Sequence, residues 1–198
     1  MRFSNFLVSI PENNLRAKKG FIIVPQDYSS IQEAINAASE NDAIVVKQGI
    51  YYENLIIDKP LSLSGEDKKT LVIGNGGVDD SNVFCVKSDN VKISGFTIKS
   101  LNYSNSKEYA NGIKINADNV SVHDNWIENT FWGILCPIQS FVNIYNNTIR
   151  ANFKEGIRFY GGNLNLILTN NVTENAGSGI AIEGYSNKIC GNKIADKK

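Results

Sequence analysis

The amino-acid sequence predicts an all-β fold: a single-stranded, right-handed parallel β-helix of about five to six rungs with three strands each, capped at its N-terminal end by an amphipathic helix. Two observations predict the strands. The chain of 198 residues holds 27 Asn and 25 Ile but only 11 Leu, which favours β-branched strands joined by polar turns over helices. Short apolar motifs also recur at nearly constant spacing, as in a solenoid.

The N-terminal part contains the helical pattern. Phe21–Val24 is predicted to be a short strand that ends at Pro25. Ser30 is a suitable N-cap because Glu33 follows three residues later. Four apolar residues then lie on one helical face: Ile31, Ala34, Ile35 and Ala38. We therefore divide the chain into a polar lead-in (1–20), a strand and cap helix (21–42) and the parallel β-helix (43–196).

Two motifs alternate in the remainder of the chain. The first, Val-x-Ile-x-Gly-Phe-x-Ile at 91–98, recurs with an Asn-containing turn at 120–127, 142–149 and 166–173, and in part at 189–194. The second is Gly-Ile-x-apolar, which begins at Gly112, Gly133, Gly156 and Gly179, with spacings of 21, 23 and 23 residues. Each period therefore contains three short strands, which describes one rung of a β-helix. A leucine-rich repeat is the alternative solenoid, but the scarcity of Leu and the β-branched return segment favour the β-helix.

The second residue of each Asn-containing turn is predicted to form a ladder along one corner of the β-helix. The ladder residues are Asn125, Asn147, Asn171 and Asn192. A tight corner requires left-handed backbone, which Asn tolerates, and stacked amides hydrogen-bond to one another and to the corner backbone. We expect Asn147→Leu to cost roughly 1–3 kcal/mol by leaving those groups unpaired.

Charge and sulfur content exclude several functions. With 20 basic and 20 acidic side chains, the chain offers no positive field for nucleic acid, and no apolar segment is long enough for membrane insertion. Cys85, Cys136 and Cys190 are expected to be mostly buried thiols rather than disulfides. Besides these three cysteines, the chain has one His and one terminal Met. These residues lack the spacing of metal ligands, so we expect no metal and no cofactor.

The N-terminus leaves the cellular location open. The apolar run at residues 6–10 is too short for the core of a signal peptide, and no small-residue cleavage site follows it. The protein is therefore expected in the cytosol or, where a leader has been removed, outside the cell or on its surface.

Four segments resemble the opening of the pectin lyase-like superfamily, which pectinesterases and many β-helix proteins share. They are Ser29–Ala38, Ala43–Gly49, Tyr51–Ile57 and Lys59–Glu66. The Asn-rich second half is similar to the β-helix repeats of the nitrous-oxide-reductase maturation factor family and of carbohydrate-binding and sugar-hydrolysis domains. Together the two resemblances cover about residues 21–196, and they imply the fold more strongly than any activity.

The resemblance implies that catalytic residues would lie on the outer face of the first strand of each rung. Period-two alternation predicts the outward residues there: Val45 and Lys47, Cys85 and Lys87, Lys114 and Asn116, Leu135 and Pro137, Arg158 and Tyr160, and Ala181 and Glu183. A pectate-lyase-like site requires several carboxylates for Ca²⁺ and a basic residue. Glu183 is the one carboxylate among these residues, so the calcium site is not expected.

Other catalytic signatures are also missing. The sequence motifs of pectinesterases and polygalacturonases are absent, and Leu135-Cys136-Pro137 lacks the Asp of the Asp-Pro motif of uronan epimerases. An enzyme would have to use Arg158 or Lys114 as the base, with Tyr160 or Glu183 assisting. His123 is expected to point outward from a different face.

The side chains around this face suit a sugar chain. The predicted binding residues are Tyr103, Tyr109 and Trp132 in the turns and Lys114, Arg158 and Tyr160 on the face. Aromatic rings stack on sugars, and cations pair with acidic glycans, although a line of cations also occurs on solvated faces that resist aggregation. We therefore expect a non-catalytic polysaccharide-binding or structural protein with an acidic polysaccharide as partner.

Two alternatives remain open. One is a polysaccharide-active enzyme, a uronate lyase or epimerase, that uses the residues named above. The other is a surface or scaffold assembly unit in which copies associate through an uncapped C-terminal end, because an open strand edge invites pairing.

Overall fold

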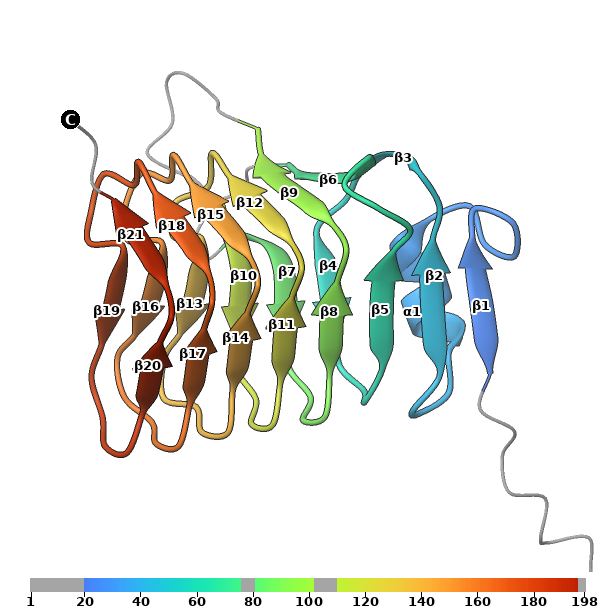
Figure 1. Ribbon diagram of the computed structural model, residues 1–198. Coiled ribbons are helices and arrows are strands. Elements are labelled where there is room, and N and C mark those ends of the chain that lie inside the picture. The colour runs from blue at the N-terminus through green and yellow to red at the C-terminus, as the bar shows by residue number, and fades with distance from the viewer. Residues whose placement is uncertain (1–19, 76–80, 102–109, 196–198) are drawn as a thin grey trace, which may run out of the picture.

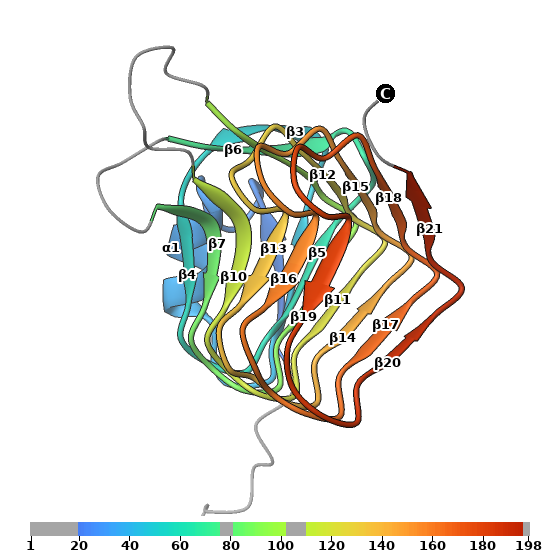
Figure 2. The ribbon, with the colours of Figure 1, turned by 90° about the vertical axis from the view of Figure 1, so that its left-hand side faces the viewer.

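The computed structural model describes residues 20–75, 81–101 and 110–195, which form a right-handed parallel β-helix of about seven rungs. The rungs follow one another along one axis, from β1 at one end to β21 at the other (Figure 1). Along that axis, three sheets surround the interior (Figure 2). Neighbouring strands in all three sheets are parallel. The predicted fold class is confirmed.

Each complete rung contributes one strand to each sheet, while β1 precedes the first complete rung and β20 and β21 follow the last. The eight-stranded sheet contains, in order, β1 (Phe21–Val24), β2 (Ala43–Val46), β5 (Ser62–Gly65), β8 (Lys92–Ser94), β11 (Ser121–His123), β14 (Asn143–Tyr145), β17 (Leu166–Leu168) and β20 (Lys188–Cys190). The seven-stranded sheet contains β3 (Gly49–Tyr52), β6 (Thr70–Gly74), β9 (Thr97–Ser100), β12 (Trp126–Glu128), β15 (Thr148–Arg150), β18 (Asn171–Thr173) and β21 (Lys193–Ala195). The six-stranded sheet contains β4 (Leu55–Ile57), β7 (Asn82–Val86), β10 (Asn111–Ile115), β13 (Ile134–Cys136), β16 (Ile157–Phe159) and β19 (Ile180–Ile182).

Inward-facing residues stack into apolar columns that fill the interior. One column of the eight-stranded sheet runs through Ile93, Val122, Ile144 and Ile167, all fully buried. A column of the seven-stranded sheet runs through Ile98, Ile127, Ile149 and Val172, also fully buried. β-Branched side chains suit these columns because they pack well on a pleated surface.

The number of rungs exceeds the five to six predicted. The first two rungs, β2 to β4 and β5 to β7, lack the Asn-containing turn, and the Gly49-Ile50 pair of β3 lies in the seven-stranded sheet instead of the six-stranded one. The predicted number of rungs depended on those motifs and was therefore too low, although the predicted β-helix already began at residue 43.

Helix α1 (Ile31–Ala37) covers the N-terminal end as predicted. The Ser30 hydroxyl accepts a hydrogen bond from the Glu33 backbone, and the Glu33 carboxylate accepts one from the Ser30 backbone. The Gln32 amide both accepts from Ile56 N and donates to Ile56 O, so it pairs with the free edge of β4 as a neighbouring strand would. Within the described residues, no helix is long and apolar enough to cross a membrane.

The asparagine ladder is present, but one predicted member was wrong. Its members are Asn125, Asn147, Asn170 and Asn192, joined by amide hydrogen bonds of 3.1, 3.0 and 2.9 Å. Asn171 instead begins strand β18 and lies outside the ladder. The left-handed backbone occurs one residue before each ladder asparagine, at Asp124, Asn146, Thr169 and Gly191, and not at the asparagine itself as predicted.

A second ladder lies at another corner, between the seven-stranded and six-stranded sheets. Thr130 Oγ1 donates to Asn152 Oδ1 at 2.8 Å, and Asn152 Nδ2 donates to Asn175 Oδ1 at 2.9 Å. All three residues are buried. Polar ladders therefore keep successive turns in register at two corners of the β-helix. The second of these corners borders the six-stranded sheet.

Candidate functional site

The outer face of the six-stranded sheet carries two columns of outward side chains. Strand pairing orders the first column as Ile56, Cys85, Lys114, Leu135, Arg158 and Ala181. The second column follows two residues later along the chain and contains Asp58, Lys87, Asn116, Pro137, Tyr160 and Glu183. Val45 and Lys47 were wrongly assigned to this face. Val45 lies in β2 of the eight-stranded sheet and Lys47 follows that strand, because the first rung reaches the six-stranded sheet only at β4.

Aromatic, cationic and acidic side chains form one connected cluster around β13, β16 and β19. The Arg158 guanidinium lies over the Tyr160 ring, with 4.2 Å between Cζ and the ring centroid, and donates to the Glu183 carboxylate. The Trp132 ring meets Tyr160 edge to face, 6.5 Å between centroids. Trp132 Nε1 donates to Glu155 Oε2 at 2.8 Å. We call these five residues the aromatic cluster.

The aromatic cluster is tightly packed. Leu135 belongs to the outward column yet is only 5% exposed, so neighbouring side chains cover it. The Arg158 Nε atom is buried and has no hydrogen-bond partner among the described residues. Tyr160, in contrast, is 46% exposed. The exposed phenol ring is therefore the group that a ligand would meet first, over a guanidinium held in place by packing.

The other half of this face carries cations. Lys114 is half-buried in β10 between Cys85 and Leu135 in its column. Lys87 follows β7 and is exposed. Within the described residues, the Lys87 ammonium has no hydrogen bond or ion pair. The two carboxylates of the aromatic cluster are engaged by Arg158 and Trp132, so the positive charge of this face lies toward β7 and β10.

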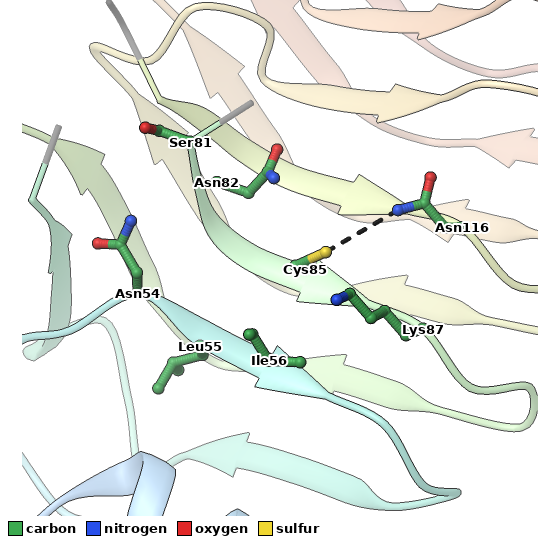
Figure 3. Close-up of a pocket in the computed structure, with 8 residues that line it drawn as sticks. All are labelled: Asn54, Leu55, Ile56, Ser81, Asn82, Cys85, Lys87 and Asn116. Atoms are coloured by element: carbon green, nitrogen blue, oxygen red, sulfur yellow. Dashed lines mark hydrogen bonds between the residues drawn. The ribbon is translucent and has the colours of Figure 1, made fainter. Parts of the chain in front are cut away.

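A cavity of about 360 Å³ opens on the same face at β4, β7 and β10 (Figure 3). Its lining residues are Asn54, Leu55, Ile56, Ser81, Asn82, Cys85, Lys87 and Asn116. We call it the amide pocket, because three of these residues are asparagines. Ile56 is 45% exposed, and Asn116 Nδ2 lies 3.9 Å from Cys85 Sγ. Apolar surface with a few convergent polar groups is typical of small-ligand sites.

Metal-ligating side chains are dispersed over the molecule. His123 in β11 faces outward from the eight-stranded sheet, as predicted, where Nδ1 lies 2.7 Å from Asp124 Oδ2 and the ring stacks on Tyr145. Cys136 is buried, and its burial raises the pKa of the thiol. Cys190 is exposed, contrary to the expectation of mostly buried thiols. Residues 20–75, 81–101 and 110–195 contain no group of three His, Cys, Asp or Glu side chains able to hold a metal ion.

Four of the six predicted binding residues lie on this one face: Lys114, Trp132, Arg158 and Tyr160. Tyr103 and Tyr109 lie outside the described residues. The sequence analysis missed Asn54 and Asn82 as site residues. These two residues can be recognised from the sequence only after the first two rungs have been aligned with the later ones. That alignment is difficult because the first two rungs lack the Asn-containing turn.

Solved structures share the fold. The rice weevil pectin methyl esterase matches 91% of this chain and 66% of its own, at 15% identity and a TM-score of 0.64. The Aspergillus niger pectin methylesterase matches 91% of this chain and 68% of its own, at 16% identity and a TM-score of 0.58. The mannuronan C-5 epimerase AlgE4 A-module of Azotobacter vinelandii matches 91% and 66%, at 15% identity and a TM-score of 0.58. The chain thus spans about two thirds of each.

Sequence comparison gives the family. No curated protein matches the chain. The family model described as "Periplasmic copper-binding protein (NosD)" matches residues 35–198. Because that match covers most of the β-helix, the chain belongs to the NosD family.

Proposed function

We propose that this member of the NosD family binds an acidic polysaccharide along the outer face of the six-stranded sheet. The observation that carries the proposal is the sequence of side chains along that face, from Lys87 and Lys114 to Arg158 and Tyr160. Cations pair with the carboxylates of an acidic glycan, and exposed aromatic rings stack on the sugar rings.

The spacing of the rungs supports a ligand that runs across the strands. Neighbouring strands lie about 4.8 Å apart, which is close to the length of one sugar unit in an extended chain. A glycan parallel to the β-helix axis would therefore meet a new pair of outward side chains at each unit. Such repetition allows many weak contacts to add up along the chain.

A location outside the cytoplasm agrees with this proposal. The NosD family is described as periplasmic, and acidic polysaccharides are components of cell envelopes and secreted matrices. We propose that the protein acts there.

Retention on an immobilised acidic polysaccharide tests the proposal. The double variant Lys114→Ala/Arg158→Ala removes two cations from the face, and we expect about a tenfold or larger loss of affinity, because hydrogen bonds to charged groups contribute about 1.5–3 kcal/mol. The matched control is Lys92→Ala/Lys188→Ala, which removes two exposed lysines from the eight-stranded sheet. Equal retention of both double variants and the parent would reject the proposal.

A uronate lyase or epimerase is the second candidate. The contact of Arg158 with both Tyr160 and Glu183 favours it, because a cation, a phenol and a carboxylate are grouped at one point. A lyase would produce an unsaturated uronate that absorbs in the ultraviolet, and an epimerase would exchange the C-5 hydrogen with deuterated water. Loss of either activity in Tyr160→Phe would support catalysis at this point.

Copper binding forms no part of the proposal. The description of the family names copper, which imidazole, thiolate and thioether groups bind. In the described part of the chain, His123 is paired with Asp124, Cys136 is buried in the core, and no group of three such donors exists. These residues do not fit a copper site.

A surface or scaffold assembly unit is the third candidate. Ile189 in β20 and Ile194 in β21 are each 50% exposed, whereas their partners Ile167 and Val172 are fully buried. Apolar side chains next to unpaired strand edges favour self-association.

A further inference from the structure

We propose that the amide pocket is a separate subsite that binds one sugar unit carrying a single carboxylate group. The inference rests on the proposed function, because it names the sugar chemistry that the same face would select. The cavity volume of about 360 Å³ lies near the lower end of the range of ligand pockets, roughly 300–1,000 Å³. That volume suits a single sugar unit better than a large cofactor.

Lys87 supplies the charge that selects a carboxylate. Its ammonium has no partner within the described residues, and Figure 3 shows the ammonium end of the side chain on the side of Cys85. An ammonium without a counter-ion at the edge of a cavity forms a charge-assisted hydrogen bond with an incoming anion at little cost in broken contacts. One such lysine in the lining matches one carboxylate on the ligand.

The asparagine amides supply polar groups for the hydroxyl groups of a sugar. Asn54 Oδ1 accepts from the Asn75 backbone at 2.8 Å, which fixes this amide and leaves its Nδ2 as a donor. The Asn82 side chain is also fixed in the lining, because its Oδ1 accepts from Asn111 Nδ2 at 2.8 Å. Asn116 lies on the opposite side of the pocket, and its Nδ2 points toward Cys85 (Figure 3). Hydroxyl groups on a sugar ring accept hydrogen bonds from amide nitrogens of this kind.

Ile56 supplies the apolar surface. It is 45% exposed in the lining of the pocket, next to Cys85 on the neighbouring strand. The C–H face of a pyranose ring is apolar and can cover this side chain, whereas inorganic phosphate or sulfate cannot. The combination of Ile56 with the amides therefore favours a sugar acid over a simple anion.

The amide pocket lies far enough from the aromatic cluster to act independently. Three strand intervals separate β7 from β16, which corresponds to roughly 14 Å at about 4.8 Å per interval. One glycan chain could fill the pocket with one unit and reach Arg158 and Tyr160 with another.

Titration with monosaccharides tests the subsite. Methyl glucuronide, methyl glucoside and inorganic phosphate are added to the isotopically labelled full chain, and amide chemical shifts are followed. We expect shifts at Asn54, Asn82 and Asn116 with the glucuronide, and binding of the glucoside and of phosphate at least tenfold weaker. Lys87→Met should weaken glucuronide binding about tenfold to a hundredfold, down to the level of the glucoside. The matched control, Lys92→Met, removes an exposed lysine from the eight-stranded sheet and should bind like the parent.

A thiol in the pocket gives a second measurement. In a Cys190→Ser background, Cys85 is the most accessible cysteine, because Cys136 is buried. Bound glucuronide should slow alkylation of Cys85 in the parent background and have no such effect in Lys87→Met. This measurement does not require the variants to bind any polysaccharide.

The outcomes separate the subsite from the proposed function. If Lys87→Met binds glucuronide like the parent, or if phosphate binds as tightly as glucuronide, the subsite is wrong, whatever the retention on polysaccharide. If the parent binds glucuronide in the pocket but is not retained on any acidic polysaccharide, the proposed function is wrong and the subsite stands.

Discussion

Asn170 and Asn171 are sequence neighbours with opposite environments. Asn170 is 1% exposed, and its Oδ1 accepts from both the backbone and the side chain of Asn147. Its Nδ2 donates to Ile144 O. Asn171 is half-buried at the start of β18, and in the part of the chain that the structure describes its Oδ1 has no hydrogen-bond partner. The ladder therefore depends on the first of these two residues.

Replacing each of the two asparagines by alanine measures this difference. Asn170→Ala should lower the free energy of unfolding by roughly 1–3 kcal/mol, because buried backbone groups lose their partners. Asn171→Ala should change it by less than about 0.5 kcal/mol. Urea unfolding followed by circular dichroism is the measurement. A larger loss for Asn171→Ala than for Asn170→Ala would contradict this assignment of the ladder.

The same pair explains where the sequence analysis failed. Leu166 and Leu168 are apolar at alternate positions, so they imitate an inward column, although Ile167 is the buried residue. That choice shifted the alignment by one residue and selected Asn171. Even spacing would have corrected it, since 125, 147, 170 and 192 are separated by 22, 23 and 22 residues.

At the scale of the strands, charged residues form a row across the outer face of the seven-stranded sheet. Lys99 in β9, Glu128 in β12 and Arg150 in β15 are direct neighbours. Glu128 Oε1 lies 2.7 Å from Lys99 Nζ, and Glu128 Oε2 accepts from Trp126 Nε1 at 2.9 Å. Burial raises the pKa of Glu128. The hydrogen bonds from Lys99 and Trp126 and the nearby positive charges together lower this pKa by more than burial raises it, so it lies below its ordinary value of 4.5.

This row predicts a pH-dependent contribution to stability. A carboxyl group whose pKa is lowered by folding stabilises the folded state fully above its ordinary value of 4.5, and the stabilisation is lost as the pH falls through the lower folded pKa. Glu128→Gln should therefore lower the free energy of unfolding by about 1 kcal/mol at neutral pH, and the difference from the parent should shrink below pH 4.5.

Urea unfolding at a series of pH values checks the Glu128→Gln prediction. Glu174→Gln is the control, because Glu174 pairs with Arg150 at 3.0 Å but is exposed, and exposed ion pairs contribute about 0–1 kcal/mol. A constant difference between parent and Glu128→Gln down to strongly acidic pH would show that the side chain acts through packing instead of charge.

At the scale of the whole molecule, the sequence predicts the architecture better than the site. Period-two alternation and polar corners are local properties, so the three-strand rung and the capping helix could be derived from them. The amide pocket combines Asn54, Asn82 and Asn116 from three successive rungs. Their proximity depends on the pairing of β4 with β7 and β7 with β10, and the first two rungs carry no motif that reveals that register.

The exposed residues of β20 and β21 give a prediction about the assembly of the molecule. Within the described residues, these strands are the last ones of the eight-stranded and seven-stranded sheets, and their side chains Ile189 and Ile194 are half-exposed. We expect the sedimentation coefficient of the protein to rise with its concentration.

The variant Ile189→Lys/Ile194→Lys tests whether these two side chains cause the association. Each side chain should contribute roughly 1 kcal/mol through apolar burial, so each substitution should lower the association constant about fivefold. The control Ile138→Lys/Leu164→Lys places the same charges at exposed apolar positions in the turns, 74% and 49% exposed, and should associate like the parent. A parent that sediments as a monomer at every concentration would contradict this expectation, and equal loss in both variants would assign the association to net charge rather than to the strand edges.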